Sequence, residues 1–77
     1  MRKVRLVSAQ QEAAQFAKKL AAVSAVAVYF LTPGGTFCAV DAGQSYVGFG
    51  QTEEALVGDL KTAGFVAVCL DDLEARA

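Results

Sequence analysis

Three segments of this chain are apolar on both faces of the strand that each would form. Residues 26–31 read VAVYFL, residues 36–42 read TFCAVDA and residues 65–70 read FVAVCL. In a fold with one helix layer on one sheet layer, the uncovered sheet face is polar, so the strands should alternate. Two arrangements fit the pattern. Either the central strands are buried on both faces within the monomer, with helices on opposite sides, or the second face packs against another protein.

The small size of the chain makes the second arrangement attractive. With 77 residues we expect a single domain over residues 1–77, and folding buries only about 60% of the surface of so short a chain. Disulfides, a metal or oligomerisation usually add the missing stability. Two cysteines and no histidine argue against a disulfide framework and an ordinary zinc site. Oligomerisation is then the remaining source of added stability. An apolar fraction of 55% agrees with it, so we expect a homodimer.

Charge and hydropathy argue against several classes of partner. The net charge is −1, without the clustered Lys and Arg that nucleic-acid binding needs. The basic cluster Arg2, Lys3 and Arg5 is interrupted by apolar residues, as on a solvated edge strand. The longest apolar run, residues 25–31, is far too short for a membrane span, and no apolar run closely follows the basic residues as in a signal peptide. We expect a cytoplasmic protein, where free thiols are normal.

The first half of the chain predicts a strand, a helix and a hairpin. Residues 2–7 alternate as a strand does, and Ser8 begins a helix with capping-box spacing that ends within residues 22–24. Residues 26–31 and 36–42 form a hairpin. Its connection, TPGG at residues 32–35, predicts a type II turn, which requires a positive φ at Gly34. A second turn, begun by Asp41, leads into a short strand at residues 46–49.

The second half predicts a helix and a last strand. Thr52 is the N-cap of the helix, which has acidic residues in its first turn and ends before Gly64 in a Schellman cap. Residues 65–70 form the last strand, and residues 71–77 are a polar tail or a short helical turn. The predicted fold is α+β, with two layers, an antiparallel sheet of four to five strands and two helices. This order resembles the ferredoxin-like βαββαβ arrangement, with an extra strand at residues 46–49. That strand also allows a three-stranded meander with the helices packed otherwise.

The stretch GFGQTEE, residues 48–54, resembles a phosphate-binding loop but lacks its chemistry. Glu53 and Glu54 place two negative charges at the helix N-terminus where a phosphate would bind. A third glycine at the dinucleotide-fold position and a loop lysine are both missing. We therefore interpret Gly48 and Gly50 as relieving crowding where the strand bends into the helix.

The chain offers no evident catalytic, cofactor or metal site. Without histidine the usual general base is absent. Cys38 and Cys69 lie in apolar strands, where a thiol is inert. Asp71 and Asp72 are adjacent and do not converge without a turn.

The sequence therefore favours a non-enzymatic module that binds another protein. Small, alanine-rich, cofactor-free domains are common as accessory or inhibitory proteins, including those of phages and mobile elements. The candidate interface consists of large apolar strand residues: Tyr29, Leu31, Phe37, Tyr46 and Phe49. The alternative is an amino-acid sensor that resembles the ACT type, although the loop at Ser8 lacks the glycine that the type implies.

Overall fold

The computed structural model describes residues 6–20 and 25–76. The described elements are α1 (Leu6–Leu20), β1 (Val26–Leu31), β2 (Phe37–Val40), β3 (Tyr46–Gly50), α2 (Glu53–Thr62), β4 (Val66–Cys69) and α3 (Leu70–Arg76). The described strands form one four-stranded sheet in the order β3-β2-β1-β4. The β1–β2 and β2–β3 pairs are antiparallel, whereas β4 runs parallel to β1. The fold is therefore mixed α+β, as predicted, but its sheet is mixed rather than antiparallel.

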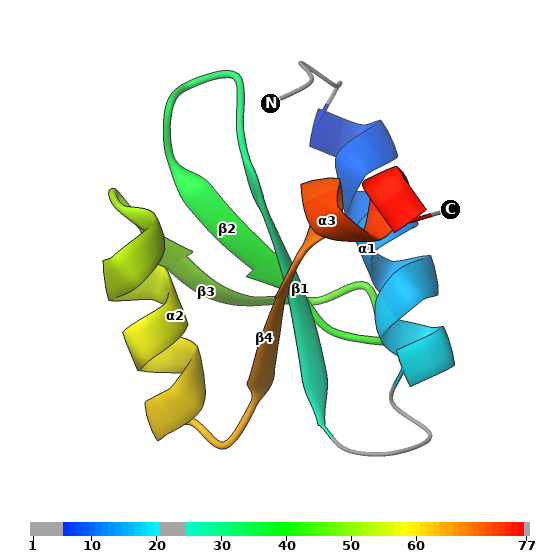
Figure 1. The fold of residues 1–77 in the computed structure, drawn as a ribbon. Helices are drawn as coiled ribbons and strands as arrows, with labels where there is room; N and C mark the ends of the chain where they lie inside the picture. Colours follow the sequence, from blue (N-terminus) through cyan, green and yellow to red (C-terminus); the bar gives the residue numbers. More distant parts are fainter. Residues whose placement is uncertain (1–5, 21–24, 77) are drawn as a thin grey trace.

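Helices cover both faces of this sheet. Figure 1 shows α1 and α3 on one side of the strands and α2 on the other. This arrangement differs from the predicted two layers and from the ferredoxin-like order. The strands β1, β2 and β3 form the alternative meander, and the chain returns through α2 to place β4 beside β1. The physical reason is that a central strand with apolar side chains on both faces must be covered on both faces.

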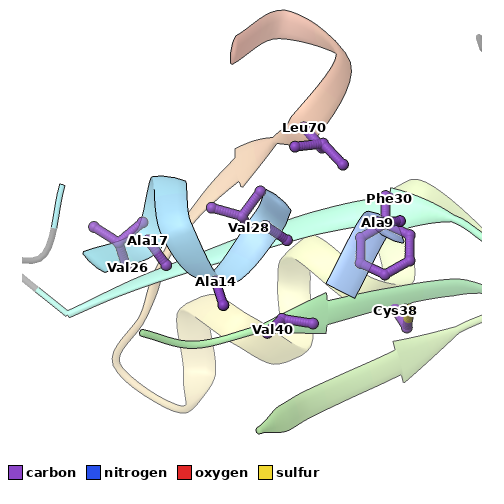
Figure 2. Close-up of a cluster of buried hydrophobic side chains, with 10 residues drawn as sticks. Ala9, Ala14, Ala17, Val26, Val28, Phe30, Cys38, Val40 and Leu70 are labelled. Carbon is purple, nitrogen blue, oxygen red and sulfur yellow. The ribbon is translucent and has the colours of Figure 1, made fainter. Parts of the chain in front are cut away.

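The two faces have separate cores. The α1-face cluster is centred on ten buried residues: Ala9, Ala13, Ala14, Ala17, Val26, Val28, Phe30, Cys38, Val40 and Leu70. Figure 2 shows small side chains from α1 lying over larger ones from β1 and β2. The α2-face cluster has five: Ala27, Tyr29, Ala39, Leu56 and Leu60. Five of the six residues of β1 are buried, so this strand is buried on both faces within the monomer.

The structure contradicts the end of the strand predicted at residues 2–7 and the helix start predicted at Ser8. Leu6, Val7 and Ser8 belong to α1, and residues 1–5 lie outside the described residues. The spacing offered a helical alternative, because Leu6 precedes Ala9 by three residues and Ala13 by seven, which is in phase with the stripe of the helix. At residues 6 and 7 the helical stripe was therefore the stronger signal.

The β1–β2 turn has a different conformation from the predicted one. The Gly35 N–H donates to the Thr32 carbonyl at 3.0 Å, which closes the four-residue turn. The positive φ of 86° falls on Gly35, not on Gly34, so the turn is not type II. The second glycine supplies the left-handed residue that brings Thr36 into register, where its carbonyl accepts from the Thr32 N–H at 2.8 Å.

Three predicted features that depend on nearby residues are confirmed: the turn at Asp41, the N-cap at Thr52 and the helix end at Gly64. The Asp41 carboxylate accepts hydrogen bonds from the N–H groups of Gly43 and Ser45 at 2.9 and 3.0 Å, which holds the second turn. The Thr52 hydroxyl accepts from the Ala55 N–H at 3.2 Å and caps α2.

At the other end of α2, Gly64 has a φ of 91° and donates to the Lys61 carbonyl. Phe65 donates to the Leu60 carbonyl at 2.9 Å, which completes the predicted Schellman cap. The following strand is shorter than predicted, because Leu70 begins α3 and is buried in the α1-face cluster.

Candidate functional site

The two glycines of the GFG stretch are explained by helix packing. A Cβ atom on Gly48 would lie 2.9 Å from Leu56 Cδ1, and one on Gly50 would lie 3.0 Å from the Leu56 backbone nitrogen. Both distances are shorter than ordinary van der Waals contact. The glycines therefore let α2 approach β3 closely, in agreement with the crowding interpretation.

Tyr29 is a buried residue that carries a polar hydroxyl group. Its side chain is 8% exposed, and its hydroxyl donates to Glu53 Oε2 at 2.8 Å. Burial is the main cause that raises the pKa of Tyr29, and the hydrogen bond to Glu53 and the neighbouring Cys69 raise it further. The phenol therefore stays neutral and keeps donating to the carboxylate at physiological pH.

This pair lies at a surface hollow beside α2, which we call the α2 groove. Its volume is about 410 Å³, and its lining residues are Tyr29, Glu53, Glu54, Val57, Gly58 and Lys61. The groove combines two carboxylates, one ammonium and an apolar middle. Sequence reasoning missed it because residues 29 and 53 are far apart in the chain. Two signals pointed to it: a phenol in an otherwise apolar strand needs a polar partner, and residues 53, 57 and 61 share one helix face.

A second feature lies on β3. The rings of Tyr46 and Phe49 stack with their centroids 5.5 Å apart; we call them the β3 aromatic pair. Phe49 is opposite Cys38 of the α1-face cluster, so it lies on that face of the sheet. Because α1 packs on β1 and β2, Phe49 remains 62% exposed.

The five candidate interface residues separate into different environments. The structure brings Tyr46 and Phe49 together on β3. Tyr29 is buried in the α2-face cluster, and Phe37 is half-buried against the same cluster. Leu31, at the end of β1, is half-buried. Of the five, Phe49 alone is exposed.

The two cysteines are free and lie on opposite faces of the sheet. Cys38 is buried in the α1-face cluster, whereas Cys69 is half-buried beside the α2-face cluster. Burial raises the pKa of the Cys38 thiol to about 11. A thiol held protonated in this way is a poor nucleophile.

Two further observations concern ions and membranes. Within residues 6–20 and 25–76, Cys, Asp and Glu side chains do not gather in any group of three that could hold a metal ion. None of the helices described by the structure is both long and apolar enough to span a bilayer.

Comparison with protein-family models gave no match, and comparisons with curated proteins and with solved structures gave none either.

Proposed function

We propose that this protein is a non-enzymatic interaction module that forms a homodimer through the outer edge of β3. The observation that carries the proposal is the exposure of Phe49, 62%, on a strand at the edge of the described sheet. An edge strand presents a row of backbone donors and acceptors that another strand can pair with. Burying a phenylalanine side chain fully is worth about 1.5–3 kcal/mol.

A second copy of the chain is the occupant that fits this edge. The sequence of β3, YVGFG, contains no charged residue, so two antiparallel copies can pair around a twofold axis without like charges meeting. The net charge of −1 opposes association only weakly. Pairing would place the two β3 aromatic pairs near each other and add core to a small domain.

In this proposal the dimer is an accessory or inhibitory protein that occupies the surface of another protein. The absence of histidine from the sequence supports a non-enzymatic role. The free thiols support a reducing compartment such as the cytoplasm.

Sedimentation equilibrium tests the dimer with one variant on each edge of the described sheet. Phe49→Asp should convert a dimer into a monomer, because it removes the exposed ring from the pairing strand and places a charge beside its copy in the partner strand. Val66→Asp is the matched control, since Val66 is 49% exposed on the opposite edge strand and should leave the dimer intact. Circular dichroism checks that both variants fold. A wild-type monomer at about 100 μM, well above a micromolar Kd, would overturn the proposal. Equal disruption by both variants would overturn the assignment to β3.

A small-molecule sensor is the second candidate function. The observation that favours it is the α2 groove, because its volume lies within the range of about 300–1,000 Å³ that ligand pockets occupy.

A further inference from the structure

We propose that the α2 groove binds a short zwitterion whose ammonium and carboxylate groups lie about 10 Å apart, as in an extended tripeptide. The inference rests on the sensor candidate and is independent of the dimer. The ammonium group would lie at Glu53 and Glu54, the carboxylate at Lys61, and the backbone or aliphatic part between them.

Helix packing does not explain the presence of a glycine at position 58 inside α2. Glycine inside a helix costs up to about 1 kcal/mol relative to alanine. A Cβ atom at Gly48 or Gly50 would crowd Leu56, whereas a Cβ at Gly58 would have no atom within 4 Å beyond its chain neighbours and the adjacent backbone of α2. Since Gly58 lines the α2 groove, a side chain there would fill space that is open now. Glycine leaves this exposed position of the groove without a side chain, at a cost in helix stability.

The floor of the groove is already organised for a cation. Tyr29 donates its hydroxyl proton to Glu53 Oε2, which orients that carboxylate. A carboxylate has about four acceptor positions, so Glu53 can accept further hydrogen bonds from an ammonium group. Glu54 is adjacent and also lines the groove. The N-terminus of α2 opposes a cation with about half a positive charge, which the two carboxylates outweigh.

The length of the ligand follows from the opposite end. Lys61 is eight residues after Glu53 in the same helix, which is about 12 Å along the axis. Lys61 would repel a second ammonium and attract a carboxylate, so a diamine fits poorly. Val57 and Gly58 form the uncharged middle. A free α-amino acid is too short to reach both ends, and this distinguishes the inference from an amino-acid sensor.

Titrations followed by amide chemical shifts test the proposal on the full chain. Trialanine should shift the resonances of α2 and of Tyr29 and should saturate with a Kd on the order of 1 mM. Alanine and N-acetyl-trialanine amide should bind at least about tenfold more weakly, because each lacks the two separated charges. A parallel titration with 6-aminohexanoate distinguishes a peptide ligand from a simple zwitterion whose two charges are separated by an aliphatic chain. Equal binding makes charge separation the requirement, whereas tighter trialanine binding assigns a peptide.

Variants locate the site. Gly58→Leu should weaken trialanine binding more than about tenfold by filling the groove, whereas Ala55→Leu adds the same side chain at an exposed position of α2 outside it and should bind as wild type does. Glu53→Gln keeps an acceptor for Tyr29 and should weaken binding about two- to fivefold. Equal binding by Gly58→Leu and wild type, absence of saturation, or equal binding of the capped peptide would each overturn the proposal. Phe49→Asp should bind trialanine normally, so failure of the dimer and failure of the groove are distinguishable.

Discussion

The two faces of the sheet are packed in opposite ways. On the α1 face the helix contributes four alanines and the strands contribute valines and Phe30. On the α2 face the helix contributes Leu56 and Leu60, and the sheet beneath contributes Ala27, Ala39, Tyr29 and the two glycines that admit Leu56. Buried alanines of α1 thus lie over larger strand residues, whereas the two leucines of α2 lie over alanines, glycines and Tyr29. The buried residues of α1 are therefore small, and those of α2 are large.

The polar content of the faces also differs. The buried residues of the α1-face cluster carry no hydroxyl or charged group. The α2-face cluster contains Tyr29, whose hydroxyl reaches the exposed Glu53 at the margin of the α2 groove. The α1-face cluster has ten buried residues and the α2-face cluster five, and the α2 groove lies beside the smaller one.

Shortening a leucine on the α2 face should have the largest effect. Leu60→Ala removes a fully buried side chain that the alanines beneath cannot replace, and should lower the free energy of unfolding by about 2–5 kcal/mol. Urea denaturation followed by circular dichroism measures the change. Lys61→Ala, at the exposed neighbouring position, should change stability by less than about 0.5 kcal/mol. A loss below about 1 kcal/mol for Leu60→Ala would mean that this face is loosely packed.

Enlarging an alanine on the α1 face should have a smaller effect of the same sign. Ala13 is fully buried between the helix and the strands, so Ala13→Leu overpacks the cluster and should cost about 1–3 kcal/mol. The same denaturation experiment applies. Gln15→Leu adds a leucine at an exposed position of α1 and serves as the control. If the two variants unfold at the same urea concentration, the α1 face has space and the contrast between the faces fails.

The thiols compare the two faces with the smallest perturbation. A disulfide reagent at pH 8 should modify Cys69 quickly and Cys38 only as the protein unfolds, because Cys38 is 1% exposed and Cys69 is half-buried. Absorbance of the released thiolate gives both rates, and Cys69→Ala isolates the slow one. Equal rates for the two thiols would contradict this prediction.

The raised pKa of Cys38 also predicts the sign of a pH effect. Because the folded pKa of about 11 exceeds the ordinary value of 9.0, the contribution of this group to the free energy of unfolding is fully present below pH 9.0. It is lost as the pH rises from there toward about 11. Cys38→Ala should reduce the loss of stability over that interval.

The local features of the fold could be predicted because their partners are close in sequence. Thr52, Asp41 and Gly64 each act on backbone groups within four residues, and the structure has all three as predicted. The β1 strand likewise has the predicted bounds, since four β-prone residues in a six-residue apolar run are enclosed by breaks in the pattern. Errors arose where two local patterns competed, as at Leu6 and Val7, which fit both a strand and a helix.

The tertiary structure alone decided which face each helix covers and which strand lies beside β1. Apolar faces on a strand indicate that both sides of the sheet must be covered. Helices of the same chain or a partner protein can provide this cover equally well, because the hydrophobic effect is non-directional. The parallel pairing of β1 with β4 and the contact between Tyr29 and Glu53 depend on that choice. The sequence determined the elements and their caps through short-range hydrogen bonds. The hydrophobic effect is non-directional, so the layers, the α2 groove and the exposure of Phe49 depend on how the whole chain packs.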